Sequence, residues 1–201
     1  MVNIAVFVSG GGTNLQAIID ACEKNEINGA VKLVISNKES AYGLTRAKNH
    51  NIKALYTKNS QVILEELDKE KIDLIVLAGY LAIVKEDLIS KYENKIINIH
   101  PSLIPSFCGP GYYGHHVHEA VYKRGVKLSG ATVHFVSSVV DGGPIILQEA
   151  IDITSANSPE EIGELVLKNV EHKLLVKAVK LYCDNKLEVV NERVVLKWKE
   201  H

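Results

Sequence analysis

Three side chains stand out in this sequence because together they could catalyse transfer of an acyl group. Asn98 and His100 are two residues apart at the end of an apolar segment, so on a strand they would point to the same face. An amide beside an imidazole can stabilise an oxyanion while a proton moves. Asp141 opens a tight turn at 141–144, and its carboxylate would orient His100 and raise the pKa of that imidazole. Taken singly, a core histidine and a turn aspartate remain the ordinary interpretations.

A glycine-rich loop near the N-terminus is the second feature that could bind a ligand. Gly11, Gly12, Thr13 and Asn14 lie between an apolar segment and a helical pattern, where a helix N-terminus favours a phosphate. The loop has no Gly-Lys-Ser/Thr ending, and Leu15 stands where the dinucleotide fingerprint needs a glycine. We therefore expect a site for an isolated phosphate, with a merely tight turn as the alternative.

The histidines and cysteines do not have the spacing of a metal site or of a catalytic nucleophile. His116 and His118 would not share a helix face, and neither Cys-x-x-Cys nor His-Glu-x-x-His occurs. Cys108 has no evident base beside it, and there is no Gly-x-Ser-x-Gly elbow. We expect no metal ion, and direct attack on the acyl carbon without a covalent enzyme intermediate.

These residues must be positioned by an alternation of short apolar strands and amphipathic helices. That alternation predicts an α/β fold with a doubly wound, mostly parallel sheet and a Rossmann-like N-terminal half. Strands are expected at 2–8, 31–35, 52–56, 73–78, 95–99, 130–136 and 144–153. Helices are expected from residue 13 or 14, over 43–49, 61–71 and 85–92, near 118, and from 158.

Local signals refine that prediction at several places. Thr13 and Gln16 have the spacing of a capping box at the first helix, and Ser158 is a Ser cap followed by proline. The long irregular loop at 101–114, rich in proline, glycine and aromatic residues, is of a kind that is usually functional. The segments 187–190 and 193–197 predict a small hairpin.

Composition limits the protein to a few classes. The 201 residues are 46% hydrophobic, which predicts a single domain over 1–201, with a phosphate-binding half at 1–100 and the catalytic loop beyond. Lys and Arg number 23 against 24 Asp and Glu, so no basic field for nucleic acid or membrane is expected. Three scattered cysteines, no signal peptide and no long apolar run favour a cytoplasmic protein.

In combination, these motifs resemble the phosphoribosylglycinamide formyltransferase family. The resemblance covers about residues 1–180 and rests on five segments in order: 9–17, 77–80, 98–105, 130–136 and 141–145. It implies a formyltransferase fold and transfer of the formyl group of 10-formyltetrahydrofolate to the amine of phosphoribosylglycinamide in de novo purine synthesis. It also implies two small-molecule partners, with a monomer or homodimer as the expected assembly.

The resemblance also assigns roles to individual positions. Asn98, His100 and Asp141 match the catalytic trio, and residues 11–14 match the phosphate loop. Glu171 matches a glutamate that binds the ribose hydroxyls. The folate-binding residues are matched by Lys58, Leu81, Ala82, Ile83 and Val84, together with Asn98. Ala82 stands where the family often has arginine, and 108–113 lengthen the loop near the site.

The resemblance leaves alternatives to test. Formyltetrahydrofolate deformylase shares this core but carries an additional N-terminal domain, whereas here the first strand is expected at residue 2. Methionyl-tRNA formyltransferase would need a further domain and a basic face. A non-catalytic nucleotide-binding module would keep the glycine-rich loop but have no use for Asn98, His100 and Asp141 together. Turnover that requires the amine substrate would separate the transferase from the others.

Overall fold

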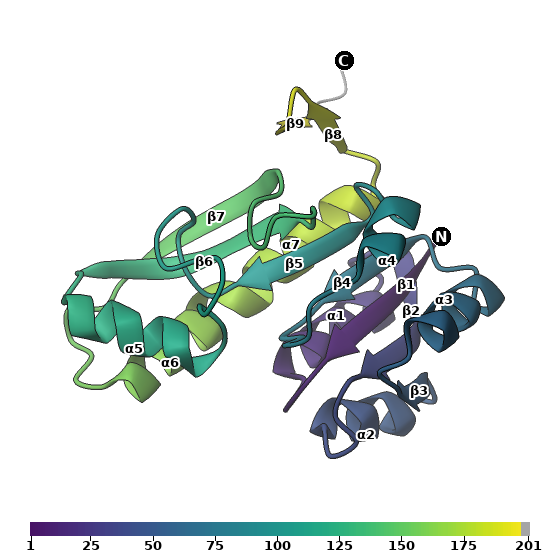
Figure 1. The fold of residues 1–201 in the computed structure, drawn as a ribbon, viewed down its shortest axis with the longest axis horizontal. Helices are drawn as coiled ribbons and strands as arrows, with labels where there is room; N and C mark the ends of the chain where they lie inside the picture. The colour runs from purple at the N-terminus through teal and green to yellow at the C-terminus, as the bar shows by residue number, and fades with distance from the viewer. Residues whose placement is uncertain (198–201) are drawn as a thin grey trace.

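A seven-stranded sheet forms the centre of the molecule in the computed structural model, which describes residues 1–197 (Figure 1). The expected domain therefore extends four residues beyond the described part. The strand order is β3-β2-β1-β4-β5-β6-β7, parallel from β3 to β5 and antiparallel for β6 and β7. The strands are β1 (Val2–Val8), β2 (Gly29–Ser36), β3 (Lys53–Tyr56), β4 (Leu74–Leu77), β5 (Ile96–His100), β6 (Leu128–Phe135) and β7 (Ile145–Asp152).

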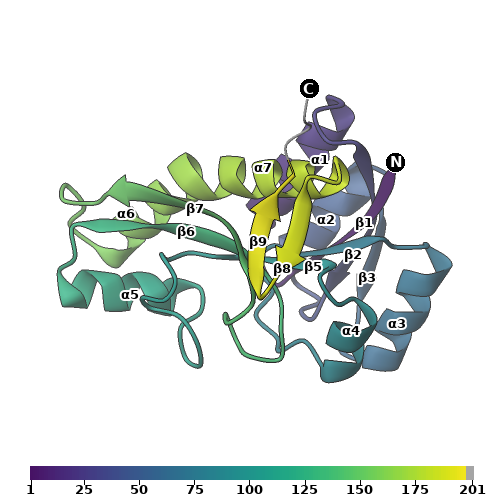
Figure 2. The same ribbon diagram turned by 90° about the horizontal axis from the view of Figure 1, so that it is seen from above.

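Helices cover both faces of this sheet, which confirms the doubly wound α/β fold. Figure 2 shows α1 and α7 on one side and α3 and α4 on the other. The helices are α1 (Thr13–Glu23), α2 (Tyr42–Asn49), α3 (Ser60–Lys69), α4 (Glu86–Lys91), α5 (His115–Arg124), α6 (Pro159–Val166) and α7 (His172–Cys183). Each face has its own apolar core, as expected for strands whose two faces are both buried.

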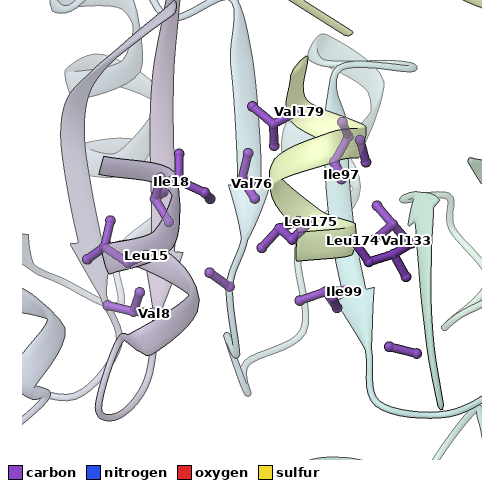
Figure 3. Packing of buried hydrophobic residues seen from close by; sticks show 14 of the residues in the cluster. Val8, Leu15, Ile18, Val76, Ile97, Ile99, Val133, Leu174, Leu175 and Val179 are labelled. Carbon is purple, nitrogen blue, oxygen red and sulfur yellow. The ribbon is translucent and has the colours of Figure 1, made fainter. Parts of the chain in front are cut away.

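The larger core joins helix α1, near the N-terminus, to helix α7, near the C-terminus. Leu15 and Ile18 of α1 and Leu175 of α7 pack over the strands with Val76 of β4 and Ile97 of β5, and all five are fully or almost fully buried (Figure 3). Burying an aliphatic side chain of this size contributes about 1.5–3 kcal/mol. The elements that carry the candidate site residues are thus anchored in one continuous cluster.

The strand order reverses at β1, whose neighbours are β2 on one side and β4 on the other. At such a point the loops that follow the two central strands diverge and leave a crevice where ligands bind in open α/β sheets. The loops that diverge here are 9–12, with Gly11 and Gly12 of the expected phosphate site, and 78–85, with the expected folate residues 81–84. The topology therefore places both sets of residues at one edge of the sheet.

Helix α1 begins at Thr13 as expected, but the predicted capping box is wrong. The N-cap is Gly12, in a left-handed conformation with φ +70°, and no side chain caps the helix. Gln16 instead donates to Asp20 Oδ1 (2.8 Å) and accepts a hydrogen bond from Arg46 Nη1 (3.1 Å). Because Arg46 lies on a different helix, a local sequence rule could not show this competition.

The expected long helix from 158 contains a π turn. Ser158 caps α6 by accepting from Glu161 N (3.2 Å), and Pro159 is the first helical residue, as predicted. Residues Leu167–Glu171 then form a π-helical segment before α7. The apolar stripe at 162, 166, 170 and 174 has a period of four, and all four side chains are buried. A wider turn of the π type keeps such a stripe on one face, where a pure α-helix would rotate it away.

The C-terminal segment forms the expected hairpin of β8 (Leu187–Val190) and β9 (Arg193–Leu196), as a separate two-stranded sheet. Asn191 and Glu192 at its turn both have positive φ, as a type I′ hairpin turn requires. Within residues 1–197, none of the helices is long and apolar enough to cross a membrane.

His118 is expected to make the folded protein sensitive to acid. It is 8% exposed between α5 and α6, and burial, with smaller contributions from His115 and His100, lowers its pKa to about 4. Above about pH 6.5 neither the folded nor the unfolded chain is protonated here, so stability is complete. As the pH falls toward 4, only the unfolded chain binds the proton, and the free energy of unfolding drops by about 3 kcal/mol.

The variant His118→Phe keeps an aromatic ring and removes the titration. Between pH 7 and pH 4.5 it should lose about 2–3 kcal/mol less stability than the parent, measured by urea unfolding at both pH values. His116→Phe, at an exposed position of the same helix, is the matched control and should behave like the parent. An unchanged pH dependence in His118→Phe would assign the acid sensitivity to another group.

Candidate active site

The structure brings Asn98, His100 and Asp141 together where β5 ends. Asn98 and His100 lie on β5, and the 141–144 turn connects β6 to β7 next to it. His100 Nδ1 lies 3.6 Å from Asp141 Oδ2, and the side chains of both residues are at most 10% exposed. The pairing of His100 with Asp141, 41 positions apart, is therefore present in the structure.

The turn that carries Asp141 is held in place by backbone contacts. Asp141 has φ +54°, in the left-handed region that aspartate tolerates better than most residues. The N–H of Gly109 donates to Asp141 Oδ2 (2.9 Å). A Cβ at Gly143 would lie 1.9 Å from the carbonyl oxygen of Phe135, so only glycine fits there. The close approach of the turn to β6 thus fixes where the carboxylate lies.

His134 is a fourth member of the cluster that sequence reasoning did not assign to catalysis. Its Nε2 lies 3.1 Å from Asn98 Nδ2 and 3.7 Å from Asp141 Oδ1. Its Nδ1 donates to the carbonyl of Phe135 (2.8 Å), which leaves Nε2 to accept from the Asn98 amide when the ring is neutral. Asn98 and His134 are direct partners in the antiparallel β5–β6 ladder. The contact between Asn98 and His134 could be recognised only once the pairing of β5 with β6 was known.

The expectation that Asp141 holds the pKa of His100 above its usual value is wrong for this structure. Burial lowers the pKa of His100, and the opposing effect of the Asp141 carboxylate is smaller. Burial would raise the pKa of Asp141, but its contacts with His134 and the Gly109 N–H bring that pKa below the usual value. At neutral pH the site therefore holds a neutral imidazole beside an ionised carboxylate.

The irregular loop at 101–114 lies against His100. The carbonyl of Phe107 lies 2.8 Å from His100 Nε2, and because a carbonyl only accepts, Nε2 carries the proton. Ser102 Oγ donates to the carbonyl of Ser106 (2.6 Å), which steadies the same stretch. In the neutral ring Nδ1 is then the unprotonated nitrogen, and it is the one that faces Asp141.

The glycine-rich loop presents free backbone donors at the start of α1. Within residues 1–197, no hydrogen-bond acceptor is assigned to the N–H groups of Gly11, Gly12 or Thr13. Gly11 and Thr13 are exposed, whereas Asn14 is only 6% exposed. Unpaired N–H groups at the positive end of a helix dipole suit an anion such as phosphate.

Glu171, at the end of the π turn, lies next to this loop. Asn14 Nδ2 donates to Glu171 Oε2 (2.7 Å), and Glu171 is 8% exposed. Burial raises the pKa of Glu171 despite that hydrogen bond. Asn14 Oδ1 is also buried and has no partner among the described residues. These oxygens are therefore suited to accept hydrogen bonds from the hydroxyl groups of a ligand.

Comparison with known proteins decides the family. Residues 2–179 match the formyl transferase family. Over 197 residues the chain is 36% identical to phosphoribosylglycinamide formyltransferase of Escherichia coli (strain K12), covering 93% of this chain and 90% of that protein. It matches the structure of glycinamide ribonucleotide transformylase 1 from Symbiobacterium toebii with TM-score 0.90 and 36% identity, over 98% and 94% of the two chains. This chain belongs to the phosphoribosylglycinamide formyltransferase family.

Three other matches are longer than this chain. The chain spans 66% of the chloroplastic phosphoribosylglycinamide formyltransferase of Arabidopsis thaliana, at 36% identity, and 62% of that of Vigna unguiculata, at 37%. A formyltetrahydrofolate deformylase from Pseudomonas syringae is similar with TM-score 0.88 and 25% identity, and the chain covers 65% of it. Because transferases and a deformylase have this fold, the fold by itself does not distinguish the two activities.

Most of the residues expected to bind folate line one pocket. Lys58, Ala82, Ile83 and Val84 line it together, although Lys58 is distant from the other three in sequence. Leu81 and Asn98 are not among its lining residues. The remaining wall is largely apolar, with a second cation at Lys85; its other members are Phe7, Asn37, Ser60, Ile63, Tyr80 and Leu88. An apolar pocket with cations suits an aromatic ligand that carries carboxylates.

Proposed function

We propose that this protein transfers the formyl group of 10-formyltetrahydrofolate to the amine of 5-phosphoribosylglycinamide, a step of de novo purine biosynthesis. The observation that carries the proposal is the buried contact between His100 and Asp141 beside the Asn98 amide. That arrangement has a clear use in acyl transfer and none in passive binding. The protein would act in the cytoplasm as a monomer or homodimer, on small-molecule substrates and without a metal ion.

The neutral state of His100 determines the order of proton transfers. The substrate amine attacks the formyl carbon, so that a C–N bond forms and the carbonyl oxygen becomes an oxyanion. Asn98 Nδ2 donates to that oxygen. His100 Nδ1, unprotonated in the resting protein, takes a proton from the attacking nitrogen, and Asp141 stabilises the imidazolium. His100 then returns the proton to the folate nitrogen as its bond to the formyl carbon breaks.

The two substrates would occupy the two sides of the crevice at β1. The N–H groups of Gly11, Gly12 and Thr13 would hold the phosphate, and Asn14 and Glu171 would hold the ribose hydroxyls. Support for this comes from the unpaired donors of the loop and the buried acceptor oxygens next to it. A buried carboxylate accepts well from hydroxyl groups, which would also lower the raised pKa of Glu171.

The folate would use the pocket at 82–84, with Lys58 near its carboxylates. Ala82 removes the arginine common at this position in the family, but Lys58 and Lys85 both line the pocket and supply positive charge. Leu81 would contribute from the rim, since it is 45% exposed and lies outside the lining. Asn98 would contact the formyl group rather than the body of the folate.

A steady-state assay with 10-formyltetrahydrofolate, with and without phosphoribosylglycinamide, tests the proposal. Folate consumption that depends on the amine substrate supports the transferase. Hydrolysis of the formyl-folate at an equal rate without the amine would support the deformylase instead. No turnover in either mixture, with ribotide binding retained, would leave a nucleotide-binding module.

A side chain at Gly11 should weaken binding of the ribotide specifically. A Cβ there meets nothing within 4 Å, so Gly11→Val should fold normally while it occupies the space of the phosphate. We expect KM for the ribotide to rise about tenfold or more, equivalent to about 1.4 kcal/mol, with KM for folate little changed. The control is Gly10→Val, since Gly10 also has open space and lies outside the proposed phosphate site. Equal effects of the two variants would argue against this placement.

A further inference from the structure

Helix α2 lies directly against the phosphate loop, although no substrate role is assigned to it. The N–H of Gly43 donates to the carbonyl of Gly10 (3.1 Å). A Cβ at Gly12 would lie 2.8 Å from the Cα of Gly43, so the two backbones meet at a pair of glycines. The loop is therefore shaped by α2 as well as by the strand and helix that it joins.

Arg46, one turn after Gly43 on α2, makes the second contact with the loop. Its Nε donates to the carbonyl of Gly11 (2.8 Å), and its Nη1 donates to Gln16 Oε1 on α1 (3.1 Å). The guanidinium lies 5.1 Å from the centre of the Tyr42 ring, a cation–π arrangement. One planar group thus joins three elements, which a flexible ammonium could not do in the same geometry.

These contacts determine which way the loop amides point. In a trans peptide the C=O of one residue and the N–H of the next point in opposite directions. The carbonyls of Gly10 and Gly11 both turn toward α2, to Gly43 N and Arg46 Nε. The N–H groups of Gly11 and Gly12 must then point away from α2. These are two of the donors that find no acceptor within residues 1–197.

We propose that Arg46 is a positioning residue of the phosphate site: it fixes the peptide between Gly11 and Gly12 so that the Gly12 N–H faces the phosphate of the ribotide. The inference rests on the proposed function for the identity of the ligand. The role of Arg46 is to orient the loop, and its charge alone does not perform it. Without Arg46 this peptide can rotate, and each binding event has to order it again.

The test compares Arg46→Gln, which removes the charge, with Arg46→Lys, which retains it. Binding of ribose 5-phosphate is measured by calorimetry, and KM for both substrates by steady-state kinetics. Loss of a hydrogen bond from a charged group predicts that both variants weaken phosphate binding by about 10- to 100-fold. KM for folate and kcat should remain within about twofold of the parent, since Arg46 contacts neither the catalytic cluster nor the folate pocket. Lys48→Gln, an exposed cation on the same helix, should match the parent.

The outcomes separate this inference from the proposed function. Near-parental binding in Arg46→Lys with loss in Arg46→Gln would show that charge suffices, and would overturn the positioning role. Near-parental binding in both variants would also overturn it. Because ribose 5-phosphate binding needs no turnover, an inactive parent that binds it would refute the proposed function and still test Arg46. An amide NMR signal of Gly12 that shifts with phosphate in the parent should lose this response in Arg46→Lys, which stays folded.

Discussion

Replacing Asp141 with asparagine should lower kcat by roughly 10²–10⁴, the usual effect of a positioned acid–base group. The substitution keeps the shape and an oxygen that can accept from the Gly109 N–H, but it removes the charge that stabilises protonated His100. KM for either substrate should change little. Because the carboxylate raises the pKa of His100 against the effect of burial, the variant should lower that pKa further.

NMR titration of His100 and steady-state kinetics check this result together. Asp87→Asn, which removes an exposed carboxylate from α4, is the matched control and should leave both kcat and the titration unchanged. The parent itself should lose activity as the pH falls through the lowered pKa of His100, because the base must be neutral. If Asp141→Asn retains parental kcat and an unchanged His100 titration, Asp141 is only a turn residue.

The second large effect is expected from Asn98. Asn98→Ala removes the proposed oxyanion donor and should reduce kcat by about 10²–10³, with both KM values nearly constant. Since Asn98 Nδ2 already lies 3.1 Å from His134 Nε2, the amide is held with its nitrogen toward the cluster. One N–H can bond His134 while the other donates to the oxyanion.

A comparison of two substitutions makes this prediction specific. Asn98→Asp keeps the size but introduces an acceptor and, when ionised, a charge close to Asp141, so it should be at least as harmful as Asn98→Ala. Far-ultraviolet circular dichroism and thermal unfolding would show whether both variants fold. An alanine variant with kcat within threefold of the parent would contradict the oxyanion role.

Much of this architecture could be predicted from local patterns, and the exceptions have physical causes. The alternation of apolar strands and helices predicted the sheet, and Ser158 with Pro159 predicted the start of α6. The capping box at Thr13 failed because Arg46, from another helix, holds the side chain of Gln16. The π turn is a wider helical turn that was recognised only from the backbone.

In the candidate site, too, local patterns predicted some residues, whereas others depend on contacts between distant segments. Asn98 and His100 could be identified because they are neighbours on one strand and stand at its end. His134 could not, since its contact with Asn98 depends on an antiparallel ladder that joins segments 36 residues apart. The pKa of His100 was predicted in the wrong direction because residue types show the carboxylate but not the depth of burial.

The reversal from parallel to antiparallel pairing at β5 also has a consequence for the order in which the protein is made. By the time residue 100 leaves the ribosome, β1 to β5 and the glycine-rich loop have been made, whereas Glu171 and α7, which pack against them, have not. The outer edge of β5 contains Ile96, Ile97 and Ile99, and it has no partner until Leu128–Phe135 is synthesised. An unpaired apolar edge of this kind is a template for aggregation. The β5–β6 pairing that brings His134 next to Asn98 is therefore also the one that covers this edge in the nascent chain.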